Sequence, residues 1–316
     1  MDLDILLRLQ DFRSGSGACL VAFLTKMSYI GEMNFVLTII AIIYWCISKK
    51  FGNYLLIGWS GNRVLNGLLK VTACTYRPWV RDARIIPDTE AMMAATGYSF
   101  PSGHSMNAAS LYGSGIVIQG SPLVLRIALI IIVALIAFSR IYLGVHTLRD
   151  ILVGTLTGLC IMWLTNKLVK WTELHPKYDL RVIGVGIGIA VVVAVFATLK
   201  SYPKDYDTDG QLLVDGLKMA NDTYKAIGWC IGLLTGWVLE KKFICFSTDV
   251  SMVTRTTRLA IGLLGHYVVS LIFIPLLNVR IPGGGGTIVS CFVQMFYVTF
   301  VFPWFVKHFE RLFIQT

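Results

Sequence analysis

Long apolar runs, separated by short polar connections, recur along the whole chain. Each run approaches the roughly 20 residues that an α-helix needs to cross the hydrocarbon core of a bilayer. The pattern predicts an all-α fold, a polytopic membrane helix bundle of about nine transmembrane helices. The windows lie at residues 30–48, 52–70, 104–119, 125–143, 147–169, 182–199, 226–240, 258–277 and 286–306. A shorter run at 17–29 fits either an interfacial helix or a further span, and periodicity does not decide between them.

The composition supports a membrane protein and excludes an ordinary soluble one. Hydrophobic residues make up 55% of the 316 residues and charged residues 15%, whereas soluble domains are about one quarter charged. The mean hydropathy is +0.68. A net charge of +10 would suggest nucleic acid binding in a soluble protein. Here we attribute it to cytoplasmic Lys and Arg and to phosphate-binding cations, and we expect no nucleic-acid partner.

The cysteines give no sign of a metal site. The chain has 7 of them, with no CxxC pair, and they lie mostly in apolar segments. Small packing residues are their simplest role, and neither a disulfide framework nor a zinc site is indicated. We therefore expect no metal and no cofactor.

Basic residues in short loops predict the orientation of the bundle. Loops at 48–53, 166–181 and 240–258, with the C-terminal tail, carry Lys and Arg and fall on one side, which we assign to the cytoplasm. The opposite side then holds the 71–103 loop, the 139–150 turn and the acidic 200–225 loop. We expect a multi-pass protein of the cell membrane.

Two polar stretches on the non-cytoplasmic side carry groups that suit an anion. Lys70 and Arg77 are seven residues apart, two helical turns, so we expect both cations on one helix face as a span ends. Ser102 is a good helix N-cap, and Gly103 after it lets the backbone approach a ligand closely. The amides that open the next helix would then form an anion-binding site.

A third stretch adds groups that can transfer protons. Arg140, His146 and Asp150 lie where an apolar segment ends. His146 and Asp150 are four residues apart at a helix start, so the carboxylate can hold an imidazole nitrogen. With His104, the three stretches supply three cations, amide donors and two imidazoles. Such a set suits phosphoryl transfer, with one imidazole as nucleophile and the other as acid for the leaving group.

These residues form a recognisable pattern. Lys70-x6-Arg77-Pro78, Pro101-Ser102-Gly103-His104 and Ser139-Arg140-x5-His146-x3-Asp150 resemble the three-part signature of the type 2 phosphatidic acid phosphatase superfamily. That superfamily includes lipid phosphate phosphatases, undecaprenyl pyrophosphate phosphatases, glucose-6-phosphatase and vanadium haloperoxidases. The resemblance covers about residues 54–170.

The resemblance implies a role for each matching residue. His146 would attack phosphorus and form a phosphohistidine, and Asp150 would orient it. His104 would protonate the departing oxygen and then activate water. The remaining residues would hold the phosphate oxygens: Lys70, Arg77, Ser102, the Gly103 amide and Arg140.

The sequence thus suggests three parts and one main function. The parts are an N-terminal interfacial segment at 1–32, a phosphatase core at 33–181 and four additional transmembrane helices at 182–316. The function is metal-independent hydrolysis of a phosphomonoester or pyrophosphate of a lipid in the bilayer.

Two alternatives remain at this point. One is glucose-6-phosphatase-like hydrolysis of a soluble sugar phosphate, because that enzyme resembles this chain in its expected layout. The other is a lipid or headgroup transporter without hydrolysis, although the two histidines argue against it.

Overall fold

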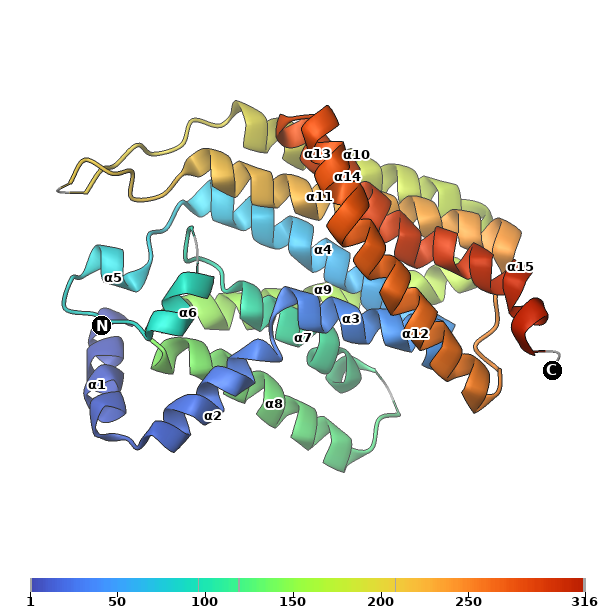
Figure 1. Cartoon of the computed structure of the whole chain (residues 1–316). Coiled ribbons are helices and arrows are strands. Elements are labelled where there is room, and N and C mark those ends of the chain that lie inside the picture. Colours follow the sequence, from blue (N-terminus) through green and yellow to red (C-terminus); the bar gives the residue numbers. More distant parts are fainter. Residues whose placement is uncertain (1, 96, 119, 208, 315–316) are drawn as a thin grey trace. The chain divides into compact units, whose positions relative to one another are not determined.

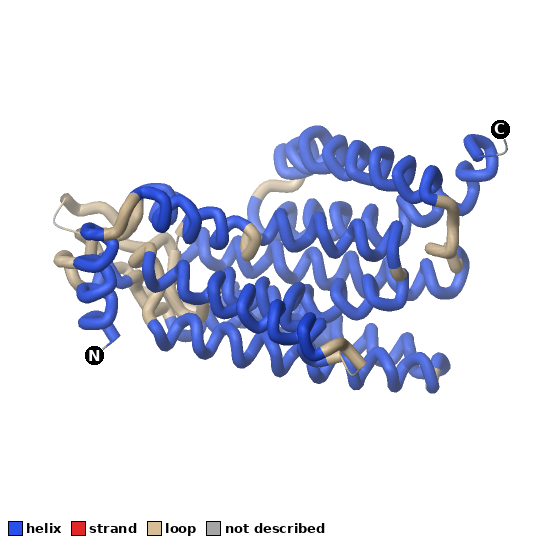
Figure 2. Tube along the Cα trace, turned by 90° about the horizontal axis from the view of Figure 1, so that it is seen from below, coloured by secondary structure: helices blue, strands red, loops and turns tan. Residues whose placement is uncertain are grey.

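The structure is a computed structural model that describes residues 2–95, 97–118, 120–207 and 209–314. The described chain is built of helices joined by loops (Figure 2). No β-strand occurs within these ranges, and the one bridge of β type pairs Tyr206 with Leu212. The all-α prediction is confirmed.

The α-helices are labelled in chain order in Figure 1. Their bounds are α1 Asp2–Gly15, α2 Ala18–Tyr29, α3 Met33–Ile42, α4 Lys49–Ala73, α5 Pro78–Arg81, α6 Thr89–Ala94, α7 Gly103–Val117, α8 Leu123–Tyr142, α9 Leu148–Leu174, α10 Asp179–Leu199, α11 Gly216–Leu239, α12 Met252–Val268, α13 Ile274–Arg280, α14 Gly283–Phe296 and α15 Phe302–Ile314. Short turns of other helix types are η1 Ile43–Ile47, η2 Pro176–Tyr178, η3 Glu240–Ile244, η4 Val269–Phe273 and η5 Tyr297–Val301.

Several helices are long and apolar enough to cross a membrane. Among the described residues 5 meet both criteria, at Leu123–Tyr142, Leu148–Leu174, Pro176–Leu199, Met252–Arg280 and Gly283–His308. A further pair, Ala18–Tyr29 with Met33–Ile47, meets them together but is bent by 54°. The multi-pass character is therefore confirmed, but the count of nine spans is not. The helix α7 has only 15 residues, and α4 contains several charged and amide side chains.

The chain folds into two compact units that interleave along the sequence. The first unit comprises Met1–Leu37, Leu65–Leu164 and Lys200–Ala220, and the second comprises Thr38–Val64, Thr165–Leu199 and Asn221–Thr316. All the predicted site residues belong to the first unit. The division at residues 32 and 181 stays a prediction.

In the first unit, α8 is the central packing element. It packs against α7 and α2, which lie beside it in Figure 1. Ala108 of α7 and Ile136 of α8 are buried in one apolar cluster. Gly115 of α7 allows the close approach to α8, because a Cβ there would lie 2.5 Å from Cδ1 of Leu129. Burial of this apolar face holds the end of α8, which carries Arg140, in place.

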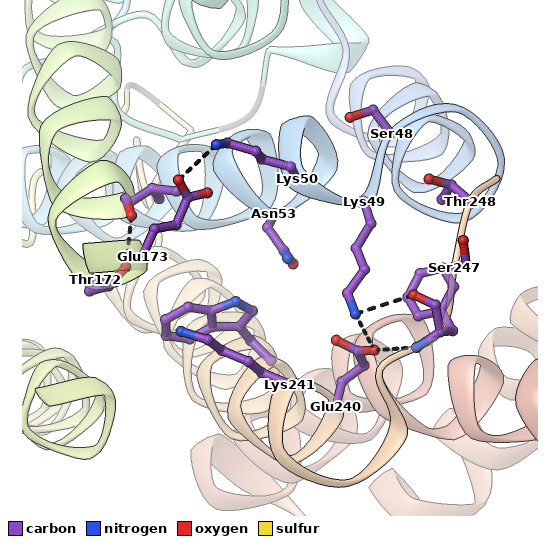
Figure 3. Close-up of a pocket in the computed structure, with 13 residues that line it drawn as sticks. Ser48, Lys49, Lys50, Asn53, Thr172, Glu173, Glu240, Lys241, Ser247 and Thr248 are labelled. Carbon is purple, nitrogen blue, oxygen red and sulfur yellow. Dashed lines mark hydrogen bonds and ion pairs between the residues drawn. The ribbon is translucent and has the colours of Figure 1, made fainter. Parts of the chain in front are cut away.

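The second unit contains a polar pocket of about 430 Å³. Its walls come from the first turn of α4, the last turns of α9 and α11, η3 and the segment after η3 (Figure 3). Lys49 and Glu240 point toward one another there, with Nζ 2.6 Å from Oε1. Lys50 pairs with Glu173 at 2.7 Å. None of the predicted phosphate-binding or catalytic residues lines this pocket.

Candidate active site

Arg77 lies against His146, although not by the route that the spacing suggests. The helix α4 ends at Ala73, and Cys74 turns the chain with a positive φ of 46°. Arg77 is therefore an extended residue before α5, and the expectation that it shares a helix face with Lys70 is wrong. A left-handed residue directly after a helix is a common helix stop.

The Arg77 guanidinium is buried and held by backbone. Its Nη1 donates to the carbonyl of Val145 at 2.9 Å and lies 2.9 Å from Nε2 of His146. Its Nε donates to the carbonyl of Gly97 at 3.0 Å. Bonds to two backbone oxygens fix the direction of the guanidinium, so a positive charge stands beside one nitrogen of the imidazole.

The other nitrogen of His146 faces Asp150. Nδ1 of His146 lies 3.3 Å from Oδ2 of Asp150, and both side chains are buried. The same oxygen accepts from the Ser99 hydroxyl at 2.5 Å and from the Thr147 amide at 2.9 Å. Thr147 and Asp150 thus cap the start of α9, since the Asp150 amide in turn donates to the Thr147 hydroxyl at 3.4 Å. The cap fixes the carboxylate that orients the imidazole.

These contacts define the state of the imidazole. The Asp150 carboxylate can only accept a hydrogen bond, so Nδ1 of His146 carries the hydrogen. Nε2 of His146 then presents its lone pair toward Arg77. Burial lowers the pKa of His146 and the charge of Arg77 lowers it further, against the opposing effect of Asp150. The imidazole is neutral near pH 7, as a nucleophile must be.

The start of α7 contributes backbone amides. Ser102 is its N-cap, fully buried, and its hydroxyl accepts from the Ser105 amide at 3.4 Å. Gly103 is the first helical residue. The Ser102 amide donates to the Asp150 carbonyl at 3.0 Å, which ties this helix start to α9. Gly154 permits the approach, because a Cβ there would lie 2.8 Å from the Ser102 carbonyl oxygen.

Arg140 and His104 complete the set. Arg140, near the end of α8, is 2% exposed, and its Nη1 donates to the hydroxyl of Ser28. Its Nε and Nη2, and Nε2 of His104, have no hydrogen-bond partner among the described residues. The His104 backbone lies at the turn that holds Ser28, because a Cβ on Gly31 would be 3.4 Å from the Ser28 carbonyl oxygen and 3.5 Å from that of His104.

Lys70 lies near the end of α4 and donates to the carbonyl of Tyr98. The structure therefore gathers every predicted residue into one region of the first unit. It also adds three that the sequence reasoning missed, Ser28, Ser99 and Gly154. Local spacing gives no signal for Ser28, which is 112 residues from Arg140. Gly154, four residues after Asp150 in α9, could have suggested close helix packing, but only with the partner helix known.

Two family models match parts of the chain. The family model "PAP2 superfamily" matches residues 49–173. The model "PAP2 superfamily phosphatase, transmembrane extension" matches residues 224–312. The first match contains all eight predicted site residues, and the second lies within the second unit.

Curated relatives carry phosphatase names. Phosphatidylglycerophosphatase B of Bacillus subtilis is 31% identical over 155 residues, which are 45% of this chain and 72% of that protein. Lipid phosphate phosphatase delta of Arabidopsis thaliana is 27% identical over 188 residues, covering 55% of this chain and 42% of the relative. Undecaprenyl-diphosphatase of Sulfolobus acidocaldarius is 29% identical over 146 residues, covering 46% and 68%.

One solved structure is also similar. It is described as the first transmembrane PAP2 type phosphatidylglycerolphosphate phosphatase from Bacillus subtilis, 26% identical, with a TM-score of 0.44 over 54% of this chain and 84% of that one. The apolar helices make the chain a multi-pass membrane protein. The family models and the relative that is 31% identical show that it belongs to the PAP2 superfamily of phosphatases.

Proposed function

We propose that the chain hydrolyses a phosphomonoester or pyrophosphate of a lipid, without a metal, through a phosphohistidine on His146. The observation that carries the proposal is the neutral His146 imidazole, with Nδ1 held by Asp150 and Nε2 beside Arg77. A nucleophile in this state needs no metal for activation.

In the first step, Nε2 of His146 attacks phosphorus and the bond from phosphorus to the leaving oxygen breaks. The negative charge of the bound phosphate favours the protonated form of His104, and His104 gives that proton to the leaving oxygen. In the second step, His104 takes a proton from water, the water oxygen attacks phosphorus, and the bond from phosphorus to nitrogen breaks. Phosphate leaves, and both histidines return to their starting states.

The cations and amides supply the electrostatic part of the reaction. Arg77, Arg140 and Lys70, with the amides that open α7, are placed to bind the equatorial oxygens, where charge collects in the transition state. The unpartnered Nε and Nη2 of Arg140 support this role, because buried donors without partners are costly unless a ligand satisfies them.

A lipid is the favoured substrate because the three relatives are named for lipid substrates or for a polyprenyl diphosphate. The test is phosphate release by the purified protein from phosphatidylglycerophosphate, phosphatidic acid, undecaprenyl diphosphate and glucose 6-phosphate. We expect release from at least one lipid and little from the sugar phosphate. Turnover of glucose 6-phosphate alone would establish the sugar-phosphate alternative instead, and binding of lipid phosphate without release would establish the transporter.

Metal independence is tested in the same assay. We expect EDTA to leave the rate unchanged and orthovanadate to inhibit, since vanadate resembles the five-coordinate transferring phosphoryl group. Loss of activity in EDTA, with recovery on addition of magnesium or zinc, would contradict the metal-independent reaction.

We also propose that the site faces the non-cytoplasmic side of the cell membrane. In a variant without native cysteines, Asp88→Cys should react with an impermeant thiol reagent on intact cells. Lys177→Cys should react only after permeabilisation. The reverse labelling would place the site on the cytoplasmic side and leave the chemistry standing.

A further inference from the structure

The Arg140 guanidinium has two ends with different surroundings. At one end, Nη1 donates to the hydroxyl of Ser28. At the other, Nε and Nη2 have no hydrogen-bond partner among the described residues. Nε and Nη2 form one edge of the planar group, and two N–H bonds on one edge match two oxygens of a carboxylate or phosphate. The bond to Ser28 thus leaves this edge available.

Ser28 is itself held firmly, at the end of α2. It is 5% exposed, and its carbonyl accepts from the Gly31 amide at 3.0 Å in the turn that ends the helix. Two side chains of α7 bind the same turn. Asn107 donates to the Gly31 carbonyl at 3.2 Å, and the Tyr112 hydroxyl donates to the Ile30 carbonyl at 3.1 Å.

The turn is also packed tightly against α8. A Cβ on Gly31 would lie 2.7 Å from Cγ2 of Ile136, so only glycine allows the turn to come this close. Ile136 precedes Arg140 by one helical turn. Contacts on α7 and α8 therefore fix the position of the Ser28 hydroxyl relative to the base of the Arg140 side chain.

We infer that Ser28 is a positioning residue that holds Arg140 with its Nε and Nη2 edge toward the phosphate. The inference rests on the proposed phosphatase function. Arginine has a long side chain with many rotamers, and a fixed acceptor at Nη1 selects the one that can bind two phosphate oxygens at once. Ser28 lies outside the residues that the three-part signature contains, and this role requires no contact between Ser28 and the substrate.

The first experiment compares Ser28→Ala with Ser28→Thr. We expect Ser28→Ala to lower kcat/KM by about tenfold, because one hydrogen bond to a charged group is lost. Ser28→Thr keeps an acceptor oxygen and should recover most of the rate. The matched control is Ser114→Ala, which removes a buried hydroxyl that donates only within α7, to the Leu111 carbonyl at 2.6 Å. Equal losses in Ser28→Ala and Ser114→Ala would overturn the inference.

A second experiment tests whether Ser28 acts through Arg140. Arg140→Lys has no edge that can bind two oxygens. In this background Ser28→Ala should cost less than about twofold, since the interaction is already gone. A loss of the full tenfold in the double variant would mean that Ser28 acts by another route, and the inference would fail.

A third experiment separates this inference from the proposed function. Binding of orthovanadate to the purified full chain needs no turnover, and Ser28→Ala should weaken it about tenfold while Ser28→Thr should not. If the wild type hydrolyses no substrate but Ser28→Ala still binds vanadate more weakly than the wild type, the inference stands and the proposed hydrolysis fails. Normal turnover and normal vanadate binding in a folded Ser28→Ala variant would support the hydrolysis and contradict the inference. If Ser28→Ala does not fold, Ser28→Cys, with a weak sulfur acceptor, replaces it in every comparison with the same expected losses.

Discussion

The cations of the candidate site and four lysines of the second unit have different kinds of partner. In the first unit, Arg77 and Lys70 donate to backbone carbonyls, and Arg140 donates to a hydroxyl. In the second unit, lysines pair with carboxylates. These pairs are Lys49 with Glu240, Lys50 with Glu173, Lys241 with Asp179 and Lys225 with Asp222.

The difference shows what each group of charges can do. A carbonyl or hydroxyl oxygen fixes the direction of a cation but does not neutralise it, so the first unit keeps positive charge for an anionic ligand. A carboxylate neutralises its partner, so the ion pairs of the second unit act on stability more than on ligand binding. Substitution of the site cations in the first unit should therefore change activity, and substitution of the paired carboxylates in the second should change stability.

The largest loss of activity is expected when His146 is substituted. His146→Ala removes the proposed nucleophile, and the rate should fall by at least about 1,000-fold with the protein still folded. Phosphate release measures the rate, and the thermal unfolding midpoint checks the fold. The control from the second unit is Lys241→Gln, which should stay within about threefold of wild type. Wild-type phosphate release by His146→Ala would exclude the phosphohistidine.

The second largest loss of activity is expected for substitution of Arg77. Arg77→Ala removes a fixed positive charge beside Nε2 of His146, and kcat should fall by about 100- to 1,000-fold, as for other preorganised donors. Steady-state kinetics on the preferred lipid phosphate measure the fall in kcat. The control is Lys50→Ala, which removes one positive charge outside the candidate site. Similar losses in both variants would mean that net charge matters more than the position of the cation.

The sequence predicted those parts of this arrangement that are local. The spacing of His146 and Asp150 places them one turn apart at a helix start, and Ser102 before an apolar run marks an N-cap. Both features depend only on neighbours in the chain. The all-α membrane fold follows from apolar runs in the same way.

What the sequence did not predict depends on distant contacts or on exact helix ends. Ser28 meets Arg140 only because α2 packs on α8, and no local pattern reports that contact. The count of nine spans treated α7 as a full window, but it ends at Val117 after 15 residues. Arg77 was expected on a helix that in fact ends at Ala73, since hydropathy does not report a left-handed residue such as Cys74.

The second unit should respond through stability. Glu240 is fully buried, and its Oε1 accepts from Lys49 and from the Phe246 amide at 3.0 Å. Glu240→Ala should lower the free energy of unfolding by about 2 kcal/mol, below the usual loss for a broken buried pair because Lys49 stays partly exposed to water. Thermal unfolding measures this loss. The control is Glu173→Ala, from the exposed pair with Lys50, whose free energy of unfolding should stay within about 0.5 kcal/mol of wild type. A large loss of kcat at unchanged stability would contradict the division of roles between the units.

The smallest expected effect is a shift in pH dependence. Burial and then Arg77 lower the pKa of His146, so the folded imidazole stays neutral below about pH 6.5, where an exposed histidine takes up a proton. The unfolded chain therefore binds more protons than the folded one in that range, and this residue's contribution to stability falls as the pH drops below about 6.5. The acid limb of kcat/KM that belongs to His146 should likewise lie below pH 6.5 in wild type. In Arg77→Ala one cause of the shift is gone, and the limb should move to higher pH. Ionisation of the substrate phosphate would not move with the variant, so an unchanged limb in Arg77→Ala would assign it to the substrate rather than to His146.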